Sequence, residues 1–318
     1  MNVRRRLIST AAATTVTALG MATLSACGGD ASATRTGKFD VVTSFYPMAF
    51  LAGRIGGNHV HVTSLTSPGQ EPHDLEISPK QIIGIEKSDA VLYLKNLQPA
   101  VDDAVAQSSV QTKIDAASLT TLEEHGNEVG GHAASHDTAK NEEASGLDPH
   151  IWLDPVRYAQ VAEGVGKAFE KADPDHAADY RKNTAALVKQ LNDLDTKFKA
   201  GLANTESKVF ITTHAAFGYL AERYGLTEEA INGLDPESEP SAARVKDLET
   251  MAEADGATTV FYETLVSDKT ARTVATDAGL KTDVLDPIEG ITATSRGKDY
   301  FAVQEANLKA LQRALGAK

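Results

Sequence analysis

Four side chains of the kinds that bind transition metals stand far apart in the sequence, at His73, His150, His214 and Asp286. They belong to the stretches EPHDLE, DPHIWLDP, KVFITTH and KTDVLD. Three imidazole nitrogens and one carboxylate oxygen form a donor set that suits a tetrahedral Zn²⁺ site. The separations match no local zinc motif, so a site built from these residues has to be assembled by the fold. Each residue taken alone also reads as an ordinary polar loop or turn residue.

The predicted strands give these four residues a common position. Short runs rich in β-branched and aromatic residues alternate with helical stretches, first over residues 39–115 and again from residue 208. Such alternation predicts parallel sheets covered by helices. Ligands bind beyond the carboxyl ends of strands in sheets of this kind, and each of the four candidates follows a strand end. Two belong to each set of strands, so the expected site is a cleft between two lobes.

One long helix is predicted to join the lobes. Residues 155–203 contain no strand signal, and Asp154-Pro155 and Asp173-Pro174 each resemble a helix start, with a capping carboxylate before proline. We therefore expect an α/β fold with two lobes, each a mostly parallel four-stranded sheet flanked by helices. The expected boundaries are 38–172 and 204–318 for the lobes and 173–203 for the helix. The alternative is a single large sheet with two surface helices.

The N-terminus reads as an export signal. Three arginines at positions 4–6 precede an apolar run, and no acidic residue occurs before Asp30. The run ends in Leu-Ser-Ala before Cys27, which resembles a bacterial lipobox. We expect a signal peptide at 1–26, lipidation of Cys27 and a flexible tether at 27–37. The alternative is a free thiol beside an ordinary cleavage site, and the choice between the general and twin-arginine export routes is open.

The charge balance excludes some partners. The chain carries a net charge of −13, and removing residues 1–26 removes three arginines and no acids, which gives −13 − 3 = −16. A surface this acidic argues against nucleic acid and anionic lipid as partners and is compatible with attracting cations.

One segment has no apolar periodicity. Residues 123–146 contain six acidic residues and the histidines His125, His132 and His136. Histidine-rich tracts can hold metal loosely, so these residues are candidates for an auxiliary low-affinity metal loop. A solvated insertion with chance histidines explains the composition equally well.

The chain resembles the zinc/manganese-type (cluster A-I) solute-binding proteins of bacterial ABC importers. The matching stretches run in order through residues 39–318: VVTSFYPMAFLAGRIGG, SLTSPGQEPHDLEISPKQI, DPHIWLDP, ITTHAAFGYLAERYGL, ESEPSAARVKDL and VLDPIEG. The resemblance implies two α/β lobes joined by one helix, with the metal in the cleft, and places the family's ligand positions on the four residues named above. Some zinc-handling members have a disulfide in the second lobe, which a chain with Cys27 alone cannot form.

The third ligand position bears on the identity of the metal. The resemblance implies a glutamate there in manganese-selective members, whereas this chain has His214. A nitrogen-rich site favours zinc over the harder manganese ion. We expect an extracytoplasmic, lipid-anchored zinc receptor that is monomeric and delivers Zn²⁺ to the membrane permease of an ABC importer, with a metallochaperone as a further possible partner. A manganese receptor is the alternative.

Two rival functions belong to other classes. A secreted zinc hydrolase would keep one metal position for water and supply a general base, yet the sequence has no HExxH motif and offers a fourth ligand. A lipoprotein that presents an acidic surface to a partner protein needs no metal. We expect no enzymatic activity. Glu263, which ends a predicted strand, is a candidate for orienting a ligand histidine from behind.

Overall fold

The computed structural model describes residues 37–125, 146–238 and 240–318. The predicted signal peptide, Cys27 and most of the predicted tether lie outside these residues, as do His132 and His136. Among the described residues, no helix is both long and apolar enough to cross a membrane.

The first sheet contains only parallel strands. Its order is β2-β1-β3-β4, from β1 (Phe39–Thr43), β2 (Val60–Ser64), β3 (Ala90–Tyr93) and β4 (Thr112–Asp115). Val41 pairs in register with Val62 on one side and with Ala90 on the other. Successive strand residues face opposite sides of the sheet, so Val41 and Val42 enter different cores.

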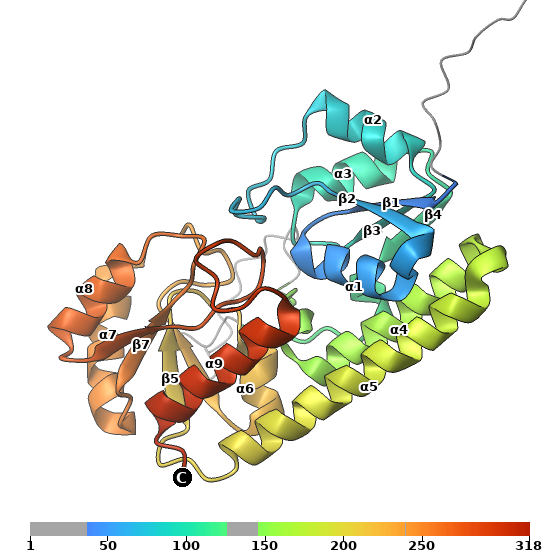
Figure 1. The fold of residues 1–318 in the computed structure, drawn as a ribbon. Coiled ribbons are helices and arrows are strands. Elements are labelled where there is room, and N and C mark those ends of the chain that lie inside the picture. Colours follow the sequence, from blue (N-terminus) through green and yellow to red (C-terminus); the bar gives the residue numbers. More distant parts are fainter. Residues whose placement is uncertain (1–36, 126–145, 239) are drawn as a thin grey trace, which may run out of the picture. The chain divides into compact units, whose positions relative to one another are not determined.

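Helices cover both faces of this sheet. Val42 and Val91 pack beneath α2 (Pro79–Lys87) and α3 (Pro99–Gln107). The opposite face packs against α1 (Tyr46–Gly56), which lies beside the long helices α4 and α5 in Figure 1. A capping box at Ser78, with Pro79 directly after it, begins α2 five residues beyond His73. The loop that carries His73 therefore runs from the end of β2 to the capped start of α2.

The second sheet repeats this plan. Its order is β6-β5-β7-β8, all parallel, from β5 (Val209–Thr212), β6 (Thr227–Ala230), β7 (Thr259–Tyr262) and β8 (Lys281–Val284). One face packs against α7 (Ala242–Asp255) and α8 (Lys269–Asp277). The other packs against α6 (Gly218–Tyr224) and α9 (Tyr300–Leu315). Two separate sheets confirm the predicted fold class and exclude a single large sheet.

Two long helices follow the first lobe in the chain, and the second of them packs against both lobes. Helix α4 (Pro155–Ala172) begins at the Asp154 cap, and α5 (Ala177–Leu202) follows after a 3₁₀ turn at Pro174–His176. The connecting helix therefore begins a few residues later than the predicted 173. Helix α5 packs against α1 and α4 on one lobe and against α6 and α9 on the other (Figure 1).

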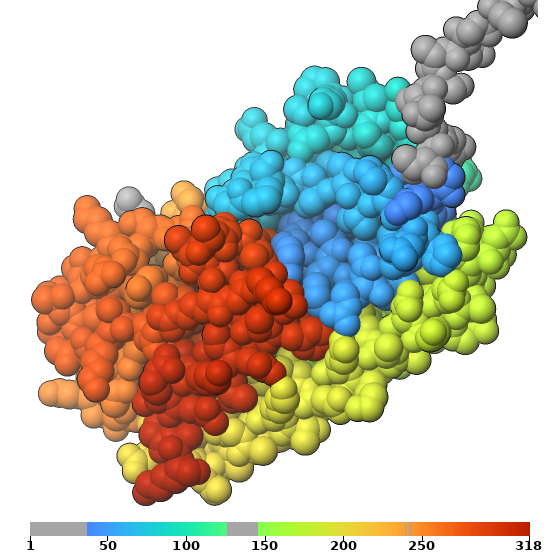
Figure 2. Space-filling model, in the orientation of Figure 1, coloured from blue at the N-terminus to red at the C-terminus, as the bar shows by residue number. Residues whose placement is uncertain are grey.

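The buried core is continuous from one lobe to the other. Phe50 of α1 packs against Tyr300 and Phe301 of α9, with ring centroids 5.3 and 5.8 Å apart. Figure 2 shows the surfaces of these segments meeting, blue against red. Short 3₁₀ turns at Gly57–His59, Ala116–Leu119 and Ile151–Leu153 complete the described elements. The third of these turns begins directly after His150.

Candidate metal centre

Three histidines and one glutamate converge between the two sheets. One side-chain donor atom from each of His73, His150, His214 and Glu289 lies within 4.8 Å of the others, a set we call the histidine–glutamate cluster. The Nε2 atoms of the three rings lie 3.2, 3.5 and 3.7 Å from Glu289 Oε1, in chain order. The side chain of His73 is 13% exposed and those of the other three are at most 2% exposed. This is the convergence expected for the three histidines.

Several donor atoms of this cluster face its centre without a hydrogen bond. Within the described residues, His150 Nε2, His214 Nε2 and Glu289 Oε2 are buried and have no hydrogen-bond partner. A buried polar atom without a partner costs about 1–3 kcal/mol. A cation at the centre would remove this cost by accepting their lone pairs, so the arrangement fits a metal ion.

The carboxylate of the cluster is Glu289, and Asp286, the carboxylate expected from the sequence, is not among its members. Asp286 is buried, but its Oδ1 accepts from the backbone N–H of Ile288 at 2.8 Å and its Oδ2 accepts from Thr264 Oγ1 at 3.0 Å. Asp286 thus holds the turn that leads to Glu289. Ile288 within this turn has a φ of 61°, which is unusual for a β-branched residue. The sequence signal for Glu289 was the acidic residue in VLDPIEG, three positions after the aspartate.

Two carboxylates outside the cluster contact the Nδ1 atoms of two of its histidine rings. His150 Nδ1 lies 2.7 Å from Asp148 Oδ1, and His214 Nδ1 lies 2.8 Å from Glu263 Oε1. A carboxylate at Nδ1 orients the ring and leaves Nε2 for a metal. Glu263 thus contacts His214, and its role in orienting a metal ligand stays a prediction. Asp148 was missed, although it directly precedes Pro149-His150.

Hydrogen bonds between the lobes fix the segment that carries His150. The indole Nε1 of Trp152 donates to the carbonyl of Pro287 at 2.6 Å, and Tyr300 Oη donates to the carbonyl of Trp152 at 2.6 Å. Pro287 belongs to the turn before Glu289. These hydrogen bonds thereby connect the segment that carries His150 to the second lobe, next to the turn before Glu289.

Burial and the neighbouring charges shift the pKa values of the cluster residues in opposite directions. Burial lowers the pKa of His150, but the Asp148 and Glu289 carboxylates outweigh it and raise that pKa to about 10. The pKa of His214 is also raised, because Glu263 and Glu289 overcome burial. Burial raises the pKa of Glu289, yet the three histidines hold it well below its usual range. The carboxylates therefore favour the protonated forms of His150 and His214.

A further buried carboxylate shapes the loop of His214. Thr212 Oγ1 donates to Glu228 Oε1 at 2.7 Å, and the backbone N–H of Phe217 donates to Glu228 Oε2 at 3.0 Å. These contacts bracket residues 213–216. Burial raises the pKa of Glu228 to about 7.

His125 belongs to a smaller, separate group with Glu123 and Glu222. The Arg157 guanidinium pairs with Glu123 and lies 3.6 Å from Glu222 Oε2. A cation bound there would compete with this arginine. The auxiliary metal loop stays a prediction, since His132 and His136 lie outside the described residues.

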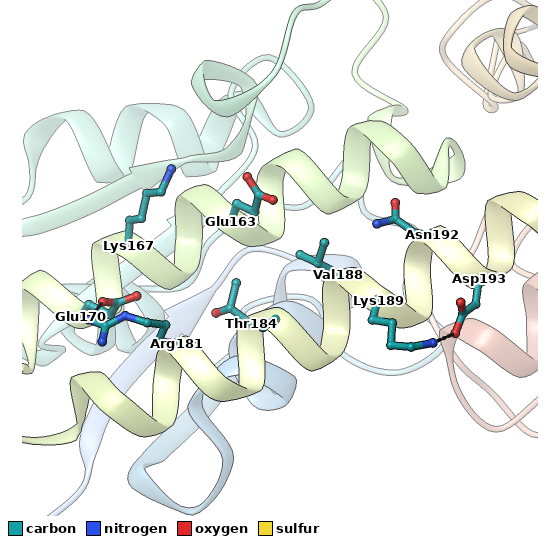
Figure 3. Close-up of a pocket in the computed structure, with 10 residues that line it drawn as sticks. Glu163, Lys167, Glu170, Arg181, Thr184, Val188, Lys189, Asn192 and Asp193 are labelled. Atoms are coloured by element: carbon teal, nitrogen blue, oxygen red, sulfur yellow. Dashed lines mark hydrogen bonds and ion pairs between the residues drawn. The ribbon is translucent and has the colours of Figure 1, made fainter.

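A groove of about 680 Å³ between α4 and α5 lies apart from these groups (Figure 3). Four of its charged residues form ion pairs, Arg181 with Glu170 and Lys189 with Asp193. Its described lining contains no histidine or cysteine, so it offers no comparable donor set.

The fold and the cluster together define a two-lobed α/β protein with a polar centre between its sheets. Residues 41–314 match the family model described as "ZnuA: Zinc-uptake complex component A periplasmic", and the chain belongs to this family.

Curated relatives resemble the chain over most of its length. It is 36% identical over 283 residues to the zinc-binding lipoprotein AdcA of Streptococcus pneumoniae, covering 87% of this chain and 56% of that protein. It is 34% identical over 289 residues to the high-affinity zinc uptake system protein ZnuA of Bacillus subtilis, covering 87% and 88%. The chain thus spans little more than half of the streptococcal relative.

Solved structures share the fold. The Zn(II)-bound ZnuA-like domain of Streptococcus pneumoniae AdcA superposes with a TM-score of 0.72 at 34% identity, covering 88% of this chain and 99% of that one. The laminin-binding protein Lmb of Streptococcus agalactiae superposes with a TM-score of 0.75 at 29% identity, covering 87% and 99%.

Proposed function

We propose that this protein is an extracytoplasmic zinc receptor that binds one Zn²⁺ at His73, His150, His214 and Glu289 and delivers it to an ABC importer. The observation that carries the proposal is the convergence of these four side chains, from distant parts of the chain, around one buried point. Relatives whose names specify zinc binding and zinc uptake support the same ligand.

The donor set favours zinc over manganese. Three imidazoles and one carboxylate match the tetrahedral N/O coordination of Zn²⁺. Manganese prefers oxygen donors and binds more weakly at a given site. The alternative, a manganese receptor, would be supported if the protein retained manganese in competition with zinc.

Transport requires binding and release without bond chemistry. A hydrolase would need a metal position for water and a carboxylate or histidine as general base. Here four donors surround the centre, and Asp148 and Glu263 are engaged with ring nitrogens. Lipidation at Cys27, domain boundaries near residues 172 and 204, a monomeric state and loading by a metallochaperone belong to the same proposal.

Metal analysis of the purified protein tests the proposal. After equilibration with equal zinc and manganese and removal of free metal, mass spectrometry should find one equivalent of zinc per chain. His150→Ala should lose it, whereas His61→Ala, whose exposed ring faces Asp40 far from the cluster, should retain it. Manganese retained against excess zinc would overturn the selectivity, and no bound metal would overturn the function.

A further inference from the structure

We infer that His125 is a positioning residue for the metal ligand His150 and acts through Asp148. The inference rests on the proposed function, because it assigns a role within the same zinc site. Asp148 is fully buried and uses its two oxygens on two rings. Its Oδ1 faces His150 Nδ1 at 2.7 Å, and its Oδ2 faces His125 Nδ1 at 3.1 Å. Three side chains thus form a continuous line that ends at the cluster.

The His125 ring packs closely against Gly218 and Tyr219 of the second lobe. The ring meets Tyr219 edge-on, with centroids 4.5 Å apart and planes at 86°. A side chain at residue 218 would come within 2.5 Å of His125 Cβ, so only glycine allows the ring to sit there. Tyr219 Oη also donates to the carbonyl of Asp148 at 2.8 Å. One helix, α6, therefore positions both His125 and Asp148.

Asp148 Oδ1 also accepts from the backbone N–H of His150 at 2.9 Å, and the contact of Oδ2 with His125 holds the other end of the carboxylate. A carboxylate bonded through one oxygen can rotate about its own axis, and a ring bonded to it would share that freedom. A donor on the second oxygen removes the rotation and keeps the far oxygen from being buried without a partner. His150 Nε2 then stays aimed at the centre of the cluster.

The outer end of this line favours positioning over metal binding by His125 itself. His125 Nε2 lies 3.6 Å from Glu222 Oε2, in the group that Arg157 already neutralises. The side chain of His125 is 11% exposed, whereas that of Glu222 is 53% exposed. We therefore expect the contact of His125 with Asp148, and not that with Glu222, to affect zinc affinity.

Substitution of His125 in the full chain tests the inference. His125→Ala should bind one zinc with affinity reduced about tenfold, the lower end of the effect seen for outer partners of metal ligands. His125→Asn should recover most of this loss, because its amide nitrogen can donate in place of Nδ1. Glu222→Gln, which changes only the outer contact, should bind zinc as the wild type does. Competition with a chromophoric chelator gives the dissociation constants.

Two further readouts separate positioning from simple structural damage. The visible spectrum of the Co²⁺-loaded protein should change in His125→Ala and return in His125→Asn, because it reports ligand geometry. Equal zinc affinity for His125→Ala and the wild type would overturn the inference alone. So would a drop from two zinc equivalents to one, which would make His125 a ligand of a second site, or a failure of His125→Asn to restore affinity and spectrum. A wild-type protein that binds no zinc would overturn the proposed function and this inference together.

Discussion

Three of the four residues in the histidine–glutamate cluster are supported by a carboxylate outside it. Asp148 and Glu263 hold two of the rings, and Asp286 holds the turn before Glu289. The inner donor atoms are left facing one another in a buried space. At the scale of single residues, the site is therefore a set of buried donor atoms that point toward a common centre. A cation or protons at that centre would stabilise them.

Substitution of the two neighbouring acids distinguishes ligand from support. Glu289→Gln removes the charged oxygen of the cluster and should weaken zinc binding at least tenfold, an effect no smaller than that of an outer partner. Asp286→Asn should change affinity much less, because its amide can still accept from Ile288 and donate to Thr264. Zinc titrations of both variants give the comparison. A larger loss in Asp286→Asn would assign the ligand to Asp286.

Zinc binding should release protons. The neighbouring carboxylates raise the pKa of His150 to about 10, so this ring holds a proton at pH 7 in the metal-free protein, and they also raise the pKa of His214. Zinc needs their neutral forms. We expect at least one proton released per zinc at pH 7, and weaker binding at pH 5.5 than at pH 7.5. Calorimetry in two buffers of different ionisation enthalpy measures the number, and a value of zero would contradict the protonation described here.

At the scale of elements, edge strand β6 stabilises the loop of His214 through a buried acid. Glu228 joins the end of β5 to the start of α6 by its contacts with Thr212 and Phe217. A carboxylate so deeply buried is costly when ionised. The hydrogen bonds of Glu228 hold the loop of His214, whereas its buried negative charge lowers the stability of the folded protein.

Glu228→Gln should therefore change the pH dependence of stability. The pKa of Glu228 is raised from 4.5 to about 7, so the folded protein retains a proton that the unfolded chain loses over that range. This contribution to stability is full below pH 4.5, falls as pH rises to 7, and then stays constant. Relative to the wild type, Glu228→Gln should gain up to about 3 kcal/mol between pH 5 and pH 8.

Urea unfolding of the metal-free proteins at both pH values measures this difference. Glu253→Gln, at an exposed position on α7, is the matched control and should show no such gain. If the difference in unfolding free energy between Glu228→Gln and the wild type were the same at pH 5 and pH 8, the raised pKa of Glu228 would be contradicted.

Helices α4 and α5 approach closely at one glycine. A Cβ at Gly166 would lie 2.3 Å from Thr184 Oγ1, whereas one at Gly84 of α2 would meet nothing within 4 Å. We expect Gly166→Ala to destabilise the protein by about 1–3 kcal/mol through overpacking. Gly84→Ala should be neutral or stabilising by up to about 1 kcal/mol. Thermal unfolding of both variants decides, and equal effects would show that the helices can separate without cost.

At the scale of the whole molecule, one core and several inter-lobe hydrogen bonds join the two sheets. Trp152 binds the carbonyl of Pro287, and Arg223 of α6 donates to both oxygens of Asp154, the cap of α4. Asp154 has no exposed surface, and such a charge needs a close partner. The lobes therefore share the elements that position the ligands.

The sequence predicts this architecture well because strand and helix periods are local. His73, His150 and His214 were recognised because each follows a strand of a parallel sheet, where ligand sites form. Glu289 was not, since its direction depends on the left-handed backbone of Ile288, a conformation that a β-branched residue does not predict. Asp148 was missed for a similar reason. Its burial, like that of Glu228, arises from packing between distant segments.

The central claim is that Zn²⁺ binds between the lobes to three imidazoles and Glu289. Anomalous diffraction at the zinc edge, from crystals of the zinc-loaded protein, tests it most directly. We predict one strong peak within about 2.0–2.2 Å of His73, His150, His214 and Glu289. A peak bonded to Asp286 in place of Glu289, or no peak between the three rings, would contradict the account.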